Sequence, residues 1–91
     1  MKNKTASSLS QMCKALGSPI RMKIFRHLKD ANKCVCGKIV NILPIAQATV
    51  SQHLKVLKEA GLVTGKISGP STCYCIDKGA LKEFKKMVRE L

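Results

Sequence analysis

The sequence predicts a small, mainly α-helical domain with a single β-hairpin near its C-terminal end. Its 91 residues are few for two domains, so residues 1–91 are expected to form one. Apolar residues recur at helical spacing along most of the chain, and two β-type runs flank the turn at residues 68–71. A core of this size lies near the lower limit for independent folding. A partner subunit, a metal or a disulfide is therefore expected to support it.

Two helices are expected in the N-terminal third. Apolar residues recur at i, i+3, i+4 and i+7 from Leu9 to Leu16, and this stripe includes Cys13. We interpret Cys13 as a small buried hydrophobic residue of that stripe. Ser18 and Pro19 then provide the cap and the first turn of a second helix. Its buried stripe comprises Ile20, Ile24, Phe25 and Leu28.

The middle of the chain combines a short extended segment with two further helices. Residues 34–36 are expected to be extended, and residues 38–43 to form a brief helix that Pro44 ends. The fourth helix is expected from Gln47 to Ala60, and a capping-box pattern at Thr49 leaves a later start open. Its buried stripe comprises Val50, Leu54 and Leu57.

The C-terminal third predicts the hairpin and a last helix. Residues 62–67 and 72–76 are rich in apolar and β-branched residues and predict the two strands. Asp77 is expected to cap the last helix, which makes about five helices in all. The apolar face of that helix comprises Leu81, Phe84, Val88 and Leu91.

The charge of the chain points to a polyanionic partner. There are 17 Lys and Arg against 5 Asp and Glu, a formal net charge of +12. With no Trp, two Phe and one Tyr, the chain lacks the aromatic residues of interfacial membrane helices and of base-stacking platforms. Double-stranded DNA therefore fits better than a membrane, RNA or a nucleic-acid single strand.

Two classes of protein are disfavoured. No apolar run approaches the roughly 20 residues of a membrane-spanning helix, and the basic first residues are not followed by the apolar stretch of a secretory signal. We therefore expect a soluble, cytoplasmic protein without a membrane partner. The sequence also lacks a Cys-x-x-Cys motif and a general base near a nucleophile, so we expect no enzymatic activity and no organic cofactor.

The five cysteines are a second functional signal. Cys13 stands alone, whereas Cys34 and Cys36, and Cys73 and Cys75, are separated by two positions. Residues at this spacing share one face only in extended chain, where they can bind the same ion. Four thiolates suit Zn²⁺, and three suit As(III) or Sb(III). An extracellular disulfide protein is disfavoured because the number of cysteines is odd.

Three segments together resemble the ArsR/SmtB family of dimeric winged helix-turn-helix repressors over nearly the whole chain. Residues 14–21 (KALGSPIR) are similar to the family's opening signature, residues 48–63 (ATVSQHLKVLKEAGLV) to its recognition helix, and residues 69–76 to its wing. Residues 34–36 (CVC) resemble the Cys-Val-Cys of arsenic- and heavy-metal-sensing members. The resemblance implies a homodimeric repressor that binds operator DNA.

The resemblance implies that the outer face of the recognition helix enters a major groove. Gln52 is the best candidate for reading a base, because an amide can bond both groups that adenine offers, and Ala48 or Thr49 can contact a thymine methyl. His53 is consistent either with a packed, hydrogen-bonded residue or with the phosphate contact that the family's Ser-x-His-Leu pattern implies. The candidate DNA-binding residues are Gln47, Ala48, Thr49, Ser51, Gln52, His53, Lys55, Lys58, Lys66 and Ser71.

Winged-helix folds pair the short segment before residue 37 with the second wing strand. This pairing would bring together the candidate metal ligands Cys34, Cys36, Cys73 and Cys75. Arsenic sensors with Cys-Val-Cys can draw a third thiolate from the same helix, where this chain has Ile39, so Cys73 or Cys75 is expected to supply it. The last helix lacks the His ligands of zinc sensors. One open alternative is a thiol-redox or persulfide-sensing repressor, in which oxidation joins two cysteines by a disulfide or polysulfide link. The other is a constitutive DNA-binding protein with a structural four-cysteine zinc site.

A dimer is expected because the apolar faces of the first and last helices exceed what a small core can cover. Two-fold symmetry would then require a palindromic operator. Binding of As(III) or Sb(III) at the cysteines would shift the DNA-facing elements and weaken DNA binding. The expected interface residues are Leu9, Met12, Leu16, Leu81, Phe84, Val88 and Leu91.

Overall fold

The computed structural model describes residues 5–36, 45–68 and 71–91. This part of the chain contains four helices and one three-stranded sheet. The helix expected over residues 38–43 lies outside it. The elements in chain order are α1 (Thr5–Leu16), α2 (Pro19–Ala31), β1 (Val35–Cys36), α3 (Gln47–Glu59), β2 (Val63–Ser68), β3 (Ser71–Ile76) and α4 (Lys78–Arg89).

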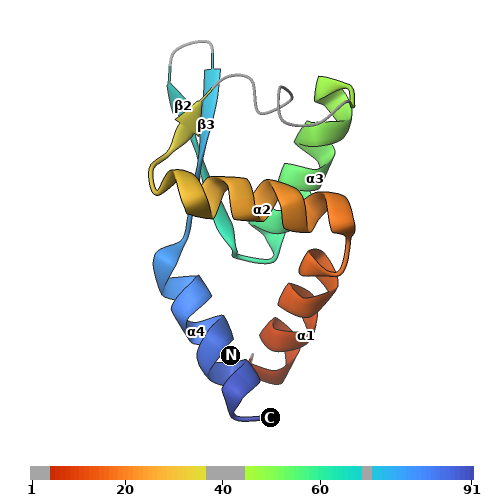
Figure 1. Ribbon diagram of the computed structural model, residues 1–91, viewed down its shortest axis with the longest axis vertical. Helices are drawn as coiled ribbons and strands as arrows, with labels where there is room; N and C mark the ends of the chain where they lie inside the picture. Colours follow the sequence, from red (N-terminus) through yellow and green to blue (C-terminus); the bar gives the residue numbers. More distant parts are fainter. Residues whose placement is uncertain (1–4, 37–44, 69–70) are drawn as a thin grey trace.

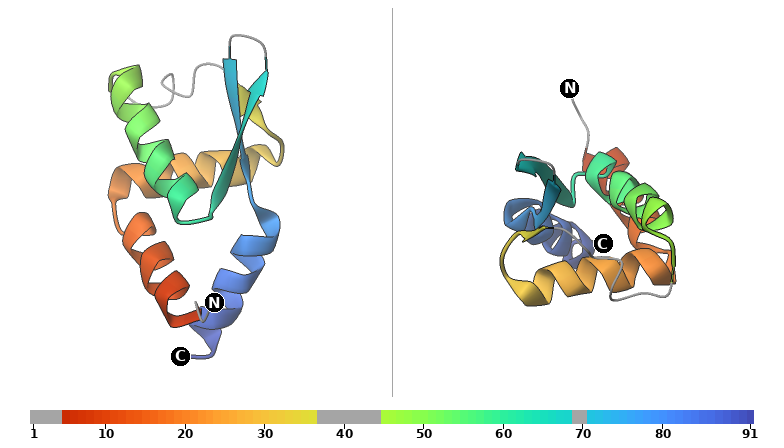
Figure 2. Two further views of the ribbon diagram at one scale, coloured as in Figure 1. Left: turned by 180° about the vertical axis from the view of Figure 1, so that it is seen from behind. Right: turned by 90° about the horizontal axis from the view of Figure 1, so that it is seen from above.

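Helix α2 crosses the middle of the molecule and separates two groups of elements (Figure 1). The sheet and α3 lie on one side of it. Helices α1 and α4 lie on the other side and converge toward the end where the chain finishes, an arrangement that Figure 2 shows from behind. The molecule measures 38 × 26 × 22 Å along its principal axes.

The start and end of α2 follow the sequence signals. The Ser18 hydroxyl accepts a hydrogen bond from the backbone N–H of Arg21 at 3.3 Å, and Pro19 occupies the first turn, as predicted. The helix ends at Asn32, which adopts a left-handed conformation with φ 54°. Asparagine tolerates this conformation better than most residues.

Helix α3 begins at Gln47, so the later start at the Thr49 capping box is wrong. Ala46 precedes the helix and provides no side-chain cap. The helix ends at Glu59, and Gly61 follows it with φ 84°, which leads the chain into β2. The predicted end at Ala60 is therefore one residue late, a usual uncertainty at a helix terminus.

The three strands form an antiparallel sheet in the order β1-β3-β2. Strands β2 and β3 form the predicted hairpin, with Val63 opposite Ile76 and Ser68 opposite Ser71. Strand β1 pairs with β3 on the other side, with Val35 opposite Tyr74 and Cys36 opposite Cys73. The expected pairing of the short cysteine segment with the second strand of the hairpin is therefore confirmed.

The core forms where α2, α3 and the sheet meet. The predicted stripes of α2 and α3 are buried, except that Ile20 is only partly covered. Asp77 caps α4 as predicted, because its carboxylate accepts from the backbone N–H of Ala80 at 3.0 Å. The deepest side chains are Ile24, Leu28, Leu57, Leu62 and Val63.

The outer helices differ from the sequence predictions at two residues. Cys13 is a free, exposed thiol, so the interpretation of Cys13 as a buried residue is wrong for the single chain. Helix α1 instead directs Met12 and Ala15 into the core, and Cys13 lies about 100° further around the helix from Met12. On α4, Met87 is buried at 7% exposure, and the sequence stripe did not include it.

Candidate DNA-binding surface and cysteine cluster

The predicted DNA-binding face of α3 is exposed. Val50, Leu54 and Leu57 fix the helix to the core and so direct the opposite face to solvent. The first turn contains no acidic residue. The exposed candidates on this helix are Gln47, Ala48, Thr49, Ser51, Gln52, Lys55 and Lys58.

His53 is half-buried at the junction between α3 and α2. Its Nδ1 lies 3.4 Å from the guanidinium of Arg21. A guanidinium has donors but no acceptor, so Nδ1 is the acceptor if the two groups share a hydrogen bond. The structure therefore gives His53 the packed, bonded environment that was one of its two interpretations.

Arg21 was not predicted as part of this junction. Its Nε donates to the carbonyl of Ala15 at 2.7 Å, and another guanidinium nitrogen lies 3.4 Å from the carbonyl of Lys14. Both carbonyls belong to the last turn of α1, and that of Lys14 also accepts from the backbone N–H of Gly17 at 3.2 Å. An arginine placed soon after a helix end is the sequence signal that could have indicated this contact.

The hairpin adds basic residues beside α3. Lys66 is exposed on β2, and the ammonium of Lys58 lies 3.6 Å from the position that a Cβ at Gly65 would occupy. Lys58 therefore reaches from α3 over β2. Ser71 begins β3, and its side chain lies outside the described part of the structure.

Positive charge on the described surface is largely unpaired within the chain. Across residues 5–36, 45–68 and 71–91, one salt bridge joins Lys29 and Asp30 at 3.8 Å, and both side chains are exposed. No buried polar or charged residue occurs in the described core. The lysines are therefore available to contact an external anion.

The two cysteine pairs lie on neighbouring strands. Cys34 and Cys75 form a disulfide with a Cα–Cα distance of 4.3 Å, and Cys36 and Cys73 are Cα partners in the ladder. Cys73 is buried at 5% exposure and is also disulfide-bonded. The strand register thus brings together the four residues that the sequence nominated, and Cys34, Cys73 and Cys75 are in disulfides.

The described residues do not form a ready metal site. Among them, no group of three or more His, Cys, Asp or Glu side chains is placed to hold an ion. A thiophilic ion needs thiolates, so its binding to Cys34 or Cys75 requires prior reduction of their disulfide. Once reduced, the sulfur atoms would form the soft donor set that such ions prefer.

Comparison with known proteins decides the family. The model described as "Bacterial regulatory protein, arsR family" matches residues 18–64, which include α2, α3 and the start of β2. The chain belongs to the ArsR family. A structure described as "ArsR-like Transcriptional Regulator from Rhodococcus sp. RHA1" superposes with a TM-score of 0.83 at 20% identity, covering 97% of this chain and 82% of that one. This likeness confirms the winged helix-turn-helix fold.

Several curated proteins are similar to this ArsR-family chain. It is 42% identical over 64 residues to the "HTH-type transcriptional repressor SmtB" of Mycobacterium tuberculosis, covering 70% of this chain and 47% of that protein. It is 39% identical over 83 residues to the "Uncharacterized HTH-type transcriptional regulator MJ1325" of Methanocaldococcus jannaschii, covering 90% and 92%. It is 32% identical over 74 residues to the "Arsenical resistance operon repressor" of Bacillus subtilis, covering 80% and 70%. The chain thus spans just under half the length of the SmtB relative.

Within the described segments, no helix combines the length and the apolar character needed to cross a membrane.

Proposed function

We propose that this ArsR-family protein is a cytoplasmic, homodimeric transcriptional repressor with no enzymatic activity. It releases double-stranded operator DNA when a thiophilic inducer binds its cysteine thiolates, and the inducer that we propose is As(III) or Sb(III). The observation that supports this proposal is the β1–β3 pairing, in which Cys36 and Cys73 are Cα partners and Cys34 is joined to Cys75. The proposed ligands are Cys34, Cys36, Cys73 and Cys75.

The DNA-binding half of the proposal rests on α3 and the wing. Gln52 is exposed on the face opposite the core stripe, where its amide can read an adenine edge. Ala48 and Thr49 precede it on the exposed surface, and Ser51, Lys55, Lys58, Lys66 and Ser71 are proposed phosphate contacts. A formal net charge of +12 favours this partner.

The regulatory half of the proposal is a thermodynamic linkage between inducer binding at the cysteines and DNA binding by α3 and the wing. An inducer weakens DNA binding only if it binds the DNA-incompetent conformation more tightly. Ligation of Cys34 and Cys36 acts on the segment that precedes α3 in the chain, and ligation of Cys73 or Cys75 acts on the wing. A coupling of about 1 to 3 kcal/mol would weaken DNA binding by about 5- to 150-fold.

The relatives support a metalloid inducer without determining it. The Bacillus subtilis relative is described as an arsenical resistance operon repressor, and it is 32% identical to this chain. Cysteines at residues 34 and 36 supply the sulfur ligands that As(III) prefers. We carry the arsenical signal to this chain as a proposal on those two grounds.

The proposed dimer uses α1 and α4, which converge away from the wing (Figure 1). Val88 of α4 and Leu91, which follows that helix, are 41% and 90% exposed in the single chain, whereas Met12 of α1 is already buried at 7%. The remaining interface candidates are half-covered: Leu9, Leu16, Leu81 and Phe84. A second copy on this face would give the two-fold symmetry of a palindromic operator.

A second candidate function is favoured by the disulfide. The protein would be a thiol-redox or persulfide sensor if it binds DNA in only one of two states, with Cys34 and Cys75 joined by the disulfide in one state and reduced in the other. A constitutive DNA-binding protein with a structural four-cysteine zinc site is the third arrangement that these residues permit. It predicts tightly held zinc and unfolding on chelation.

Fluorescence anisotropy on promoter DNA at fixed salt tests these functions. The fully reduced protein should bind DNA and release it on titration with arsenite, and the Cys34→Ser, Cys36→Ser variant should bind but not respond. Cys13→Ser is the matched control, because Cys13 is a free thiol outside the cluster, and this variant should respond normally.

Two other outcomes would redirect the proposal. Reduced protein that ignores arsenite but loses DNA on addition of a diamide-type oxidant would contradict the metalloid inducer and favour the redox sensor. Protein that binds DNA equally in every state and retains zinc through purification would contradict both sensors.

A further inference from the structure

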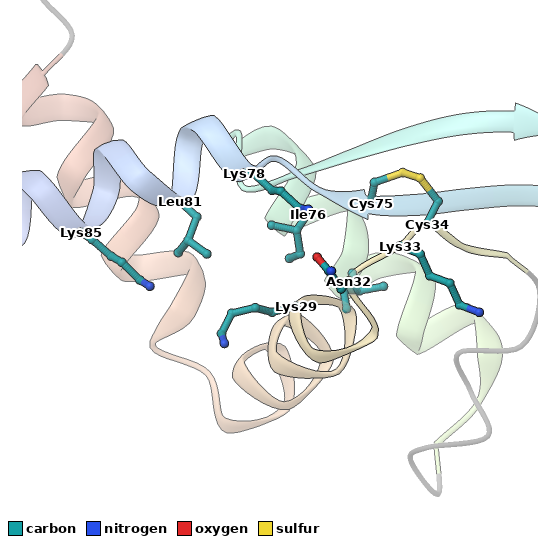
Figure 3. Close-up of a pocket in the computed structure, with 10 residues that line it drawn as sticks. Lys29, Asn32, Lys33, Cys34, Cys75, Ile76, Lys78, Leu81 and Lys85 are labelled. Carbon is teal, nitrogen blue, oxygen red and sulfur yellow. A yellow bond between two sulfur atoms is a disulfide. The ribbon is translucent and has the colours of Figure 1, made fainter.

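A pocket of about 530 Å³ lies between the end of α2, the start of β1, the end of β3 and the first turns of α4. Figure 3 shows the Cys34–Cys75 disulfide at one end of this pocket. The apolar part of its lining comprises Leu28, which is fully buried, and the half-buried Ile76 and Leu81. The volume falls within the range of about 300 to 1,000 Å³ that is usual for small-molecule sites.

Four lysines line the same pocket. They come from three parts of the chain: Lys29 from α2, Lys33 from the residues before β1, and Lys78 and Lys85 from α4. In Figure 3, Lys29 and Lys85 extend toward the space between α2 and α4, whereas the ammonium of Lys33 points away from them. Among the described residues that line the pocket, none is Asp or Glu.

Two carboxylates next to the pocket leave most of this charge uncompensated. Asp30 lies 3.8 Å from Lys29, but both side chains are exposed and such a pair is weak. Asp77 points its carboxylate at the N–H of Ala80 as the cap of α4. The pocket therefore attracts an anion that can also contact an apolar wall.

The disulfide gives the pocket a reactive end. Cys34 is exposed and Cys75 is half-buried, so an approaching thiolate reaches the sulfur of Cys34 more readily. Small inorganic anions would use the lysines but neither the apolar wall nor the sulfur atoms. A small organic thiol that carries carboxylates would use all three features.

We propose that this pocket binds a low-molecular-weight thiol bearing carboxylate groups, and that this thiol exchanges with the Cys34–Cys75 disulfide. Its thiolate attacks Sγ of Cys34 and forms a new S–S bond. The Cys34–Cys75 bond breaks, and its electron pair leaves on Sγ of Cys75 as a thiolate. One disulfide is consumed and one mixed disulfide forms, so the step needs no other oxidant. This proposal rests on the proposed function in one respect, because the sulfur atoms that exchange are those proposed to control DNA binding.

Exchange rates measured without DNA test the pocket. The oxidised full-length protein is treated with mercaptosuccinate or with uncharged 2-mercaptoethanol, and mass spectrometry follows the mixed disulfide. The exchange rate of each thiol with the protein is divided by the exchange rate of the same thiol with a small uncharged disulfide in solution. This ratio removes differences in the intrinsic reactivity of the two thiols. We expect the normalised rate to be about tenfold higher for mercaptosuccinate at low salt.

Matched variants separate the pocket from the general positive charge of the chain. Lys29→Gln with Lys85→Gln should remove most of the preference, whereas Lys82→Gln with Lys86→Gln, which changes exposed lysines of α4 outside the lining, should keep it. Succinate, which has the carboxylates but no thiol, should slow mercaptosuccinate and leave 2-mercaptoethanol unaffected. Thermal unfolding of each variant checks that it is folded.

Equal normalised rates for the two thiols, or an equal loss of preference in both variant pairs, would overturn the proposal. A loss of DNA affinity in Lys29→Gln, Lys85→Gln with an unchanged thiol preference would overturn it too, because these lysines would then serve DNA. Since the exchange assay contains no DNA, its failure leaves the repressor proposal untouched. Failure of DNA binding with a preserved thiol preference would contradict only the repressor.

Discussion

At the scale of single residues, Arg21 joins three helices. It bonds the last turn of α1, belongs to the first turns of α2, and contacts His53 of α3. Hydrogen bonds from a charged donor are stronger than neutral ones, and here they reach the carbonyls of Ala15 and Lys14 at the C-terminal end of α1. Arg21 therefore fixes how α1 and α3 are placed against α2.

Replacing Arg21 by Ala should lower the free energy of unfolding by about 1 kcal/mol, which is below the range of about 1.5 to 3 kcal/mol for bonds to charged groups, because the side chain is only half-buried. Urea unfolding measures this. Arg26→Ala, on the exposed surface of the same helix, should change stability by no more than about 0.5 kcal/mol. Equal effects of the two variants would contradict the role given to Arg21.

Substitution of two glycines by alanine should change the stability of the protein in opposite directions. Gly61 has φ 84°, which an L residue adopts with strain, so Gly61→Ala should destabilise the protein by about 1 kcal/mol. Gly79 lies in α4 with only an ordinary contact near its added Cβ, so Gly79→Ala should stabilise by about 0.5 kcal/mol. Thermal or urea unfolding of the pair checks both signs.

The sequence predicted residues whose role is local and missed those whose role depends on tertiary packing. Ser18 and Asp77 were predicted as caps because a cap bonds N–H groups two or three residues away. Cys13 was placed wrongly because the stripe on α1 is wide, and which part of it faces the core depends on the position of α2. No periodicity in α1 alone determines that position.

At the scale of elements, the sheet was predicted more fully than the helix ends. The turn residues and the flanking β-type runs gave both strands of the hairpin, and the pairing of β1 with β3 was expected from the fold resemblance. The cysteine cluster follows from this register. Its oxidation state could not be predicted, because identical positions suit a metal ion and a disulfide.

The Cys34–Cys75 disulfide should stabilise the oxidised protein substantially. It joins residues 41 positions apart, and closing such a loop as a single cross-link corresponds to about 4 kcal/mol of unfolded-chain entropy. Because Cys73 is also disulfide-bonded, a second cross-link already restricts the unfolded chain, and the stabilisation should be smaller than this value. The Cys34→Ser, Cys75→Ser variant should therefore unfold at lower urea concentration than the oxidised wild type. Cys13→Ser should unfold like the wild type, and a double variant as stable as the wild type would contradict the prediction.

At the scale of the whole molecule, the described core and the C-terminal end of the chain differ in how far their apolar residues are covered. Val88 and Leu91 are apolar and exposed, although most apolar residues of α2, α3 and the sheet are covered. Burial of such residues stabilises an interface by about 25 cal/mol per Å² before the costs of association are subtracted. The fold is thus consistent with one core per chain and a separate dimer contact.

Charge at this contact should shift the protein toward the monomer. Val88→Glu with Leu91→Glu is expected to raise the dimer dissociation constant by at least about tenfold. Dimer formation would then remove two charged carboxylates from water, which costs free energy. Sedimentation equilibrium measures this constant. Met22→Glu changes an apolar residue of α2 that is 37% exposed, and should leave the constant unchanged. A wild type that is monomeric at every concentration would contradict the proposed interface.

The disulfide also divides the oxidised chain topologically into a ring and two arms. The ring runs from Cys34 to Cys75 and contains α3 and β2, while α1 and α2 form one arm and α4 the other. A protease that cuts once inside the ring leaves a single covalent molecule, which separates into two fragments only after reduction. A cut in either arm releases a fragment at once. Gel migration with and without reductant therefore reports where an oxidised molecule has been nicked.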